Sequence, residues 1–394
     1  MTDAAAEKAQ AAHAGLEAPR TIVVIGGGQA AGWVVKTLRK EGFDGRLVMI
    51  ADEIHLPYER PPLSKAVLSG EADIETVRLV KPDDFDALNV EAWQPDCATS
   101  IDREQRIVRT QSGREVQYDR LVIATGGAAR RLPDALVKTS HITYLRTLDE
   151  AVVLGERLRA SKRVLVVGGG WIGLEVAATA RKLGVDATVV EGAPRLCARS
   201  LPPMVSDFLL QLHRANGVDV RLNASLVSIA DHPNDANRIR ATFANGSTLD
   251  ADFAVAGIGL TPHTALAEAA GIKVEDGIVV DHFGATDDPR IFACGDVANH
   301  PSAWLKRACG SNRGPTRRTR RSRRQKRCSA ISNRTRTFRG SGPINTTSIC
   351  KSSATFRAMR NSRYAAICRA NTPRSFIWKT ARFAVSSPLT HRAN

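Results

Sequence analysis

Two glycine-rich turns are the residues of this chain best suited to hold a ligand. In the first, Gly26, Gly28 and Ala31 follow a G-x-G-x-x-G/A spacing directly after the apolar run TIVVI at 21–25. The first glycine permits a tight turn, the second lets the backbone approach a pyrophosphate, and the small third residue lets a helix pack closely on the strand. The helix that begins at this turn points its positive N-terminus at the phosphates. The pattern predicts a dinucleotide site.

The second turn has the stricter form with three glycines. Gly168, Gly170 and Gly173 come directly after the apolar run RVLVV at 163–167. Two such units in one chain predict two bound dinucleotides. A duplicated fold in which one of the two sites has lost its ligand is the alternative.

An acid follows each turn at the distance that suits a ribose. Asp52 comes after the apolar run RLVMI at 46–50, and Glu191 comes after ATVV. A carboxylate at Glu191 accepts hydrogen bonds from a ribose 2′-hydroxyl and repels a 2′-phosphate, which favours NADH over NADPH. Arg195, four residues later, keeps NADPH as an alternative.

The elements that position these residues alternate between strands and helices. Strand, glycine turn, helix and strand recur in order, which predicts an α/β fold with two Rossmann-like, three-layer domains. Three further segments, YDRLVIATGG, ADFAVAGIGLTP and TDDPRIFACGDVA, read as strands that return to a glycine. The last of them places Asp296 just after a strand and a glycine.

Composition argues for a globular protein without a membrane span. No stretch of eighteen or more apolar residues occurs, and the Ala-rich first twenty residues lack the apolar core of a signal peptide. We therefore expect a cytoplasmic protein. The seven cysteines form no C-x-x-C pair and no zinc-like cluster, so we expect no metal site and no disulfide framework.

With these residues assembled, the chain resembles a known family from about 21 to 306. The segments HLPYERPPLSKAVLSG, YLRTLDEA, GGGWIGLEVAATA, GIGLTPHTALAEAAG and IFACGDVA carry the resemblance. They are similar to the FAD-containing, NADH-dependent ferredoxin reductases of oxygenase systems, the putidaredoxin reductase type. This family has the glutathione-reductase-like fold without its redox disulfide.

The resemblance implies a role for particular residues. Lys65 matches the lysine near flavin N5, and Glu175 matches a glutamate that pairs with this lysine beside the nicotinamide, so both are predicted to be catalytic. The residues implied for FAD are Gly26, Gly28, Ala30, Ala31, Asp52, Lys65, Arg146 and Asp296, and those for NADH are Gly168, Gly170, Gly173 and Glu191. From the residues alone, Lys65 reads first as an exposed lysine. A helix N-terminal acid is the alternative for Glu175, and a turn aspartate is the alternative for Asp296.

The resemblance also implies how the chain is divided. A disordered lead-in at 1–19 precedes an FAD-binding domain in two parts, 20–147 and 248–306, with an NADH-binding domain at 148–247 inserted between them. A tail without a normal third domain occupies 307–394. The implied activity is NADH:ferredoxin oxidoreduction: hydride passes from NADH to FAD, and single electrons then leave to a small iron–sulfur ferredoxin or a rubredoxin. A rubredoxin reductase, an NADH oxidase and a nitrite-reductase flavoprotein of the same fold are the alternatives.

The tail from 307 to 394 differs from the rest of the chain in charge. It has 22 Lys and Arg and no Asp or Glu, whereas the first 306 residues have 34 basic and 40 acidic residues. A nucleic-acid-binding arm and a low-complexity extension are two interpretations. The third is a shifted reading frame: with codons started at the old third base, RACGSNRGPTRRT permits GVRLESWANAQNQ, which is typical of the family's third domain. We favour the frameshift, and so expect no nucleic-acid partner and an activity impaired by loss of the domain that covers the flavin.

Overall fold

A five-stranded parallel sheet is the centre of the first unit of the molecule. The computed structural model describes residues 18–281, 283–302 and 307–310. The strand order is β20-β7-β1-β2-β3, and every neighbouring pair is parallel. These strands are β1 (Thr21–Ile25), β2 (Arg46–Ile50), β3 (Glu91–Trp93), β7 (Arg120–Ile123) and β20 (Ile291–Ala293).

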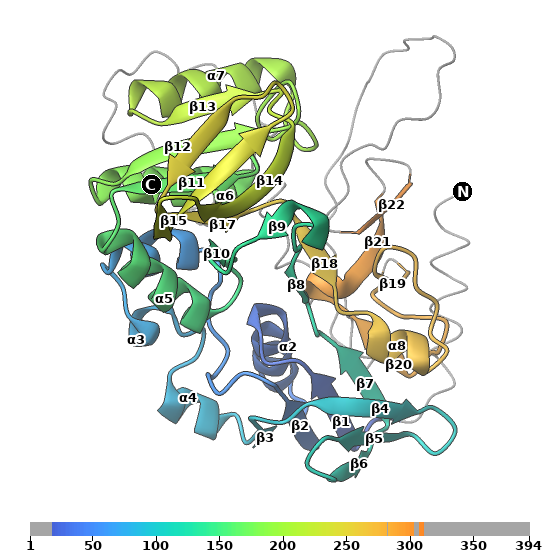
Figure 1. The fold of residues 1–394 in the computed structure, drawn as a ribbon. Coiled ribbons are helices and arrows are strands. Elements are labelled where there is room, and N and C mark those ends of the chain that lie inside the picture. The colour runs from blue at the N-terminus through green and yellow to red at the C-terminus, as the bar shows by residue number, and fades with distance from the viewer. Residues whose placement is uncertain (1–17, 282, 303–306, 311–394) are drawn as a thin grey trace, which may run out of the picture.

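A second five-stranded parallel sheet is the centre of the second unit (Figure 1). Its order is β10-β17-β11-β12-β13, and every neighbouring pair is parallel. The four strands β17-β11-β12-β13 repeat the order of β7-β1-β2-β3, whereas the edge strand β10 comes first along the chain in its sheet and β20 comes last in its own. These strands are β10 (Ile142–Thr143), β11 (Arg163–Val167), β12 (Asp186–Glu191), β13 (Asp219–Leu222) and β17 (Phe253–Ala256). The predicted β1, β2 and β11 are confirmed with these bounds.

Helices and smaller sheets cover the two central sheets. The helices are α2 (Gln29–Lys40), α3 (Ile74–Val77), α4 (Pro82–Ala87), α5 (Leu148–Arg159), α6 (Trp171–Lys182), α7 (Pro203–Ala215) and α8 (Ala265–Ala269), with shorter helical turns η1 (Leu63–Val67, π-helical), η2 (Asp134–Leu136) and η3 (Gly295–Val297). The remaining strands are β4 (Ala98–Asp102), β5 (Ile107–Thr110), β6 (Glu115–Gln117), β8 (Gly127–Ala129), β9 (Val137–Lys138), β14 (Leu226–His232), β15 (Asp235–Phe243), β16 (Thr248–Ala251), β18 (Leu260–Pro262), β19 (Ile278–Val279), β21 (Ala298–Ser302) and β22 (Arg307–Gly310).

The first unit has three layers because β1 is apolar on both of its faces. Ile22 and Val24 pack with α2, whereas Val23 and Ile25 pack with the antiparallel sheet β4-β5-β6 on the other side. Side chains alternate between the faces of a strand, so a continuous apolar run is what a strand buried on both faces requires. The layers fix the end of β1, where the first glycine turn begins.

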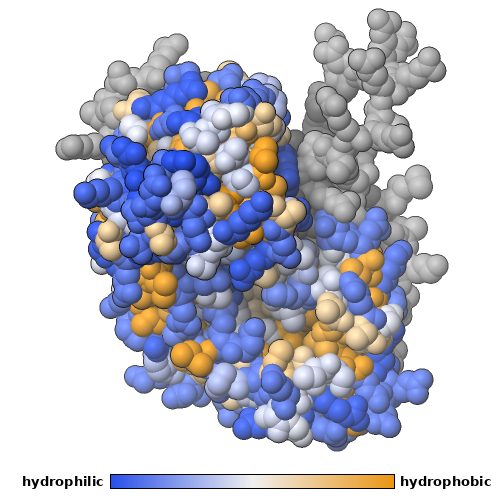
Figure 2. Space-filling view, viewed as in Figure 1, coloured by the Kyte–Doolittle hydropathy of each residue, from blue (hydrophilic) through white to orange (hydrophobic). Residues whose placement is uncertain are grey.

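The second unit is layered in the same way. Val164 and Val166 of β11 pack with α5 and α6, and Leu165 and Val167 pack with the sheet formed by β16-β15-β14-β9. The predicted α/β fold with two Rossmann-like, three-layer units is therefore confirmed. Hydrophilic side chains cover most of the visible surface of both units, with hydrophobic ones in small separate groups (Figure 2).

The second unit extends beyond the boundaries predicted at 148 and 247. β9 and β10 precede residue 148 but pair with β14 and β17 of the second unit. β16 pairs with β15, and β17 lies between β10 and β11 in the central sheet, although both strands come after residue 247. The segment 248–256 therefore belongs with the inserted unit, not with the second part of the first unit. The sequence hides this because ADFAVAG has the same apolar pattern as a strand of either sheet.

The predicted tail begins with a strand. β22 is antiparallel to β21, so regular structure continues four residues past the boundary at 306. The tail from 311 and the lead-in up to 17, with the predictions of disorder and of a frameshift, lie outside the described residues. In the described ranges no helix has the length and apolar character that crossing a membrane requires.

Candidate active site

In the first glycine turn the fold requires a glycine at 26 but not at 28. Gly26 has φ +123°, donates its N–H to Ile50 O at 2.7 Å, and has no room for a Cβ because Ala124 O occupies that position. Gly28 caps α2 with an ordinary φ of −80°, and a Cβ there would meet no atom closer than Arg60 Nη2 at 3.4 Å. Space is therefore left above the N-terminus of α2, where a pyrophosphate fits.

The first turn of α2 brings distant parts of the first unit together. Ala31 is fully buried, as the close packing of helix and strand requires. Ala30 lies against Gly295, where a Cβ would come within 2.8 Å of the Ala30 Cβ, so η3 with Asp296 lies next to the glycine turn. Asp52 is exposed just beyond β2, at the place where a ribose would lie in a Rossmann unit.

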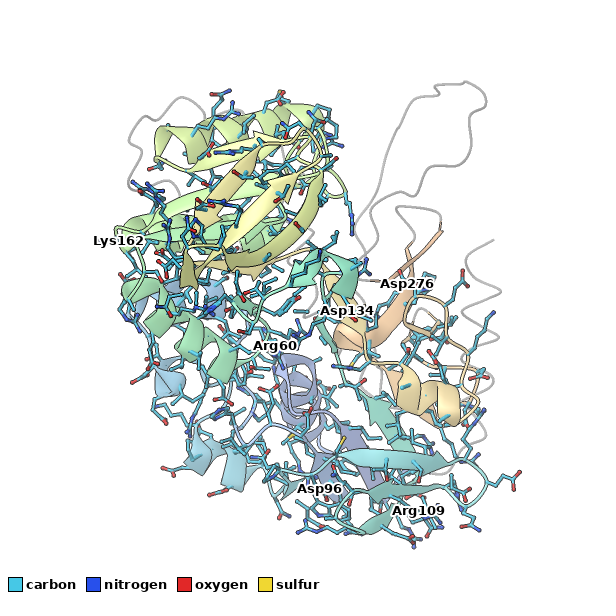
Figure 3. The ribbon with its side chains drawn as sticks, viewed as in Figure 1. Arg60, Asp96, Arg109, Asp134, Lys162 and Asp276 are labelled. Atoms are coloured by element: carbon cyan, nitrogen blue, oxygen red, sulfur yellow. The ribbon has the colours of Figure 1, made fainter. Side chains whose placement is uncertain are left out.

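An arginine pair lies beside the first turn. Arg146 Nη2 donates to Asp296 Oδ2 at 2.8 Å, and Arg60 Nη1 donates to the Arg146 carbonyl at 2.6 Å. Arg60 lies between α2 and α5 (Figure 3). Burial, and then the charge of Arg60, lower the pKa of Arg146, and its buried Nε makes no hydrogen bond to the described residues. Arg60 lies next to Gly28 and Arg146 next to Gly126, so two positive charges lie beside the glycine turn, where they fit the anionic FAD.

A buried tyrosine joins this region to the start of α5. Tyr58 Oη donates to Glu53 Oε2 at 2.5 Å and accepts from the Leu148 N–H at 3.0 Å. Glu53 Oε1 accepts from Arg60 Nη2 at 2.6 Å. Burial raises the pKa of Tyr58 above its usual range, so the phenol stays protonated and keeps donating. Tyr58 and Arg60 were not predicted as site residues, although both lie in the segment HLPYERPPLSK, and Glu53 directly follows the acid predicted for the ribose, Asp52.

The second glycine turn likewise combines glycines that the fold requires with one that leaves space for a ligand. Gly168 has φ +111° and donates to Val190 O at 2.9 Å. Gly173 has no room for a Cβ, because Gly168 O lies there. Gly170 caps α6, and a Cβ on it would find its nearest atom, Gly257 O, at 3.8 Å. The fold therefore needs Gly168 and Gly173, whereas Gly170 leaves space for a ligand.

Glu191 is fixed at the end of β12 by two backbone donors. Its Oε2 accepts from the Gly169 N–H and its Oε1 from the Ala193 N–H, both at 2.7 Å. The carboxylate is thus held beside the second glycine turn with lone pairs left for ribose hydroxyls.

Arg195 is bound within its own loop. Its Nη1 donates to Leu201 O at 2.5 Å and its Nη2 to Ala198 O at 2.7 Å, while Ser206 Oγ lies 3.1 Å from Nη1. To bind a 2′-phosphate, this guanidinium would have to give up its hydrogen bonds within the loop. The geometry favours the NADH alternative over the NADPH one.

Lys65 and Glu175 meet where the two units join. Lys65 lies on η1 of the first unit and Glu175 on α6 of the second, and Lys65 Nζ is 2.7 Å from Glu175 Oε2. Lys65 Nζ also donates to Pro61 O at 3.0 Å. The pair is partly exposed, with 36% of the lysine and 27% of the glutamate side chain accessible. The structure therefore brings these two residues together, while their catalytic roles remain predictions.

Two nucleotide-binding units that meet at the Lys65–Glu175 ion pair are the arrangement of an NAD(P)H-dependent flavin oxidoreductase. A family model agrees with this class, because the pyridine nucleotide-disulphide oxidoreductase model matches residues 20–311. The chain belongs to this family.

Similar proteins are found among characterised reductases. Putidaredoxin reductase CamA of Pseudomonas putida is 40% identical over 296 residues, which cover 74% of this chain and 70% of that protein. The ferredoxin–NAD(+) reductase component of the p-cumate 2,3-dioxygenase system, also of Pseudomonas putida, is 39% identical over 281 residues, 71% of this chain and 68% of that protein. A crystal structure of the covalent putidaredoxin reductase–putidaredoxin complex superposes with a TM-score of 0.70 at 38% identity, over 75% of this chain and 71% of that one.

Proposed function

We propose that this protein is the NADH-dependent reductase of an oxygenase system, and that it passes electrons from NADH through FAD to a small iron–sulfur ferredoxin. The observation that carries the proposal is the contact between Lys65 and Glu175. It joins an element of the first unit to the helix that begins at the second glycine turn, so the ends of two dinucleotides meet there. Relatives that reduce putidaredoxin, or that serve a dioxygenase system, support the same reaction.

The residues of the first unit bind and orient FAD. Gly28 and the N-terminus of α2 receive the pyrophosphate, Asp52 receives the ribose, and Arg146 with Asp296 receives the polyol chain. Bound FAD supplies the chemistry, since a flavin takes up electrons in pairs and releases them singly. The Lys65 ammonium, held by Glu175 and Pro61 O, is a cation that stabilises negative charge developing on the reduced ring.

The residues of the second unit bind and orient NADH. Gly170 leaves room for the pyrophosphate at the N-terminus of α6, and Glu191 accepts from the ribose hydroxyls. The negative charge of Glu191 and the restrained Arg195 both select against a 2′-phosphate.

The described cysteines favour electron transfer directly from the flavin. The described cysteines, Cys97, Cys197 and Cys294, form no disulfide with one another. Burial, helped by the charges of Glu191 and Glu175, raises the pKa of Cys197 to about 12, so its reactive thiolate is scarce at neutral pH. In this part of the chain no cysteine pair is ready to take the electrons.

Stopped-flow mixing tests the proposal. NADH added without oxygen to the FAD-loaded protein is expected to bleach the flavin, and an iron–sulfur ferredoxin is expected to restore its colour. Rapid recovery with oxygen alone would instead favour an NADH oxidase, and recovery with rubredoxin but not ferredoxin a rubredoxin reductase. A cytoplasmic location belongs to the proposal, because NADH is supplied there.

The proposed frameshift is tested at the level of DNA. Sequencing across codon 307 is expected to show one base missing, or two added, relative to a frame that encodes the third domain. An uninterrupted frame for the basic tail would refute this and would reopen the nucleic-acid interpretation.

A further inference from the structure

Ser64 is a buried polar residue between the two units, next to Lys65 in the chain. Only 2% of it is exposed. Its hydroxyl donates to Glu175 Oε2 at 2.5 Å, and its carbonyl accepts from Thr179 Oγ1 at 2.8 Å. Both partners are on α6, whereas Ser64 is on η1. Ser64 thus connects the first unit to the helix of the second unit through two hydrogen bonds.

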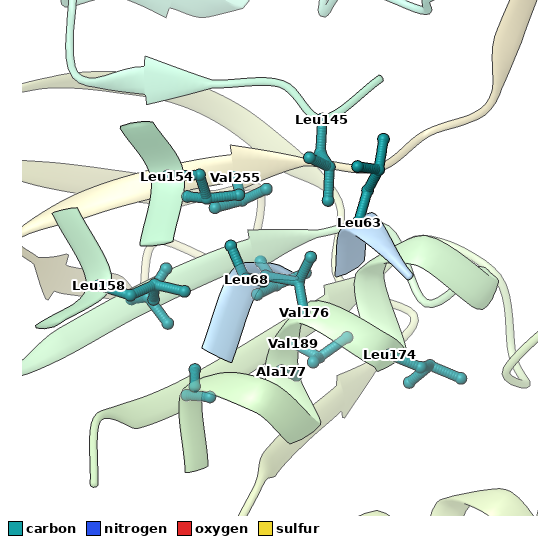
Figure 4. Packing of buried hydrophobic residues seen from close by; sticks show 14 of the residues in the cluster. Leu63, Leu68, Leu145, Leu154, Leu158, Leu174, Val176, Ala177, Val189 and Val255 are labelled. Carbon is teal, nitrogen blue, oxygen red and sulfur yellow. The ribbon is translucent and has the colours of Figure 1, made fainter. Parts of the chain in front are cut away.

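The spacing on α6 explains why one residue makes both contacts. Glu175 and Thr179 are four residues apart and therefore lie on the same face of the helix. Leu63, directly before Ser64, and Leu68, four residues after it, pack into the core of the second unit with Leu174 and its neighbours (Figure 4). The apolar contacts bring η1 against α6, and the hydroxyl of Ser64 then determines where the glutamate lies.

Glu175 Oε2 accepts from Ser64 and Lys65 at the same time. The ion pair is partly exposed, and an exposed pair holds its geometry weakly by itself. A hydrogen bond from a buried hydroxyl to a charged group is a stronger and more directional restraint. Without that hydroxyl the glutamate is free to turn toward water and to leave the lysine.

We propose that Ser64 is a positioning residue that holds Glu175 against Lys65 and thereby aligns the nicotinamide and flavin sites for hydride transfer. The positioning is a property of the protein itself, while its consequence for hydride transfer rests on the proposed function. The two parts are tested separately.

The first test measures the reactivity of the Lys65 amine in the full 394-residue chain, with or without bound cofactor. Competitive acetylation is followed by mass spectrometry, with the exposed Lys162 as the internal reference. Ser64→Ala is expected to raise the ratio of Lys65 to Lys162 labelling by roughly three- to tenfold, toward the value of Glu175→Ala. The matched control is Thr179→Val, which removes the other hydrogen bond to Ser64 and is expected to change the ratio less than about twofold.

The second test uses the FAD-loaded protein and measures flavin reduction at increasing NADH concentration. Ser64→Ala is expected to lower the limiting rate roughly tenfold and to leave the NADH concentration for half-saturation unchanged. Ser64→Thr, which keeps the hydroxyl, is expected to restore the rate, and Ser64→Ala is expected to add little when Glu175 is already Ala. A labelling ratio in Ser64→Ala equal to that of the unchanged protein would overturn the positioning role. Absence of NADH-driven reduction in the unchanged protein would overturn the proposed function and leave the labelling result valid.

Discussion

The substitution Gly170→Ala is expected to weaken the binding of NADH while leaving the stability of the fold nearly unchanged. An added Cβ would find its nearest atom, Gly257 O, 3.8 Å away, and the backbone at φ −83° and ψ −179° is one that alanine adopts readily. Alanine is a poorer N-cap than glycine, but it also restricts the unfolded chain, so the free energy of unfolding is expected to stay within about 1 kcal/mol of the original.

Binding of NADH responds differently, because the methyl group would occupy the space through which the pyrophosphate approaches the N-terminus of α6. Loss of one hydrogen bond from a backbone N–H to a charged phosphate costs about 1.5–3 kcal/mol, which weakens NADH binding roughly ten- to hundredfold. The matched variant Gly28→Ala is expected to weaken the binding of FAD instead of NADH. Its Cβ would lie above the N-terminus of α2, with Arg60 as its nearest neighbour.

The assay uses purified protein whose FAD content is read from its visible absorbance. The flavin is then reduced without oxygen, so that added NADH is not consumed, and NADH binding is followed by a fluorescence titration. Gly170→Ala is expected to keep its FAD content and its unfolding midpoint while the Kd for NADH rises. A folded Gly170→Ala protein with an unchanged Kd for NADH would refute the assignment of the second turn. Loss of FAD from this variant would show that the two sites are assigned the wrong way round.

Three further predictions concern stability and specificity. Gly173→Ala is expected to lower the free energy of unfolding in urea by roughly 1–3 kcal/mol, because its Cβ would overlap Gly168 O; an unchanged midpoint would contradict this packing. Arg195→Met is expected to keep the preference for NADH over NADPH, because the guanidinium is already bound to Ala198 O and Leu201 O; an altered preference in steady-state kinetics would show that Arg195 reaches the coenzyme. Burial lowers the pKa of His213 below its ordinary value of 6.5. As the pH is lowered through 6.5, the unfolded state therefore takes up more protons than the folded state, and the free energy of unfolding decreases. His213→Phe is expected to reduce this fall, and urea midpoints at pH 7 and about pH 5 that change equally in both proteins would contradict it.

The parts of the fold that the sequence predicts well have local causes. β1, β2 and β11 are apolar on both faces, and Gly26 and Gly168 have positive φ angles at the turns that follow β1 and β11. The boundaries of the inserted unit were harder to predict from the sequence. β9 and β10 have two residues each, which is too short for a recognisable pattern of apolar residues. Their membership in the second unit depends on pairing with strands about a hundred residues away.

In the site, too, some features follow from the local sequence and others only from the packing of distant segments. The glycine turns and the acids follow from spacing, whereas the contact of Ser64 with Glu175 spans 111 residues and appears only when α6 packs on η1. Arg195 shows the same limit. Spacing alone keeps it as a candidate for a 2′-phosphate, but the turn at Cys197, with φ +46°, folds the loop so that its own carbonyls take up the guanidinium.

The most direct test of the two assigned sites is an anaerobic titration of the FAD-saturated protein. It is titrated once with NADH and once with NADPH. About one equivalent of NADH is expected to bleach the bound flavin, since one hydride carries the two electrons that a flavin holds. NADPH is expected to bleach it far more weakly. Bound flavin that NADH leaves coloured, or that NADPH bleaches equally well, would contradict the assignment of the two sites.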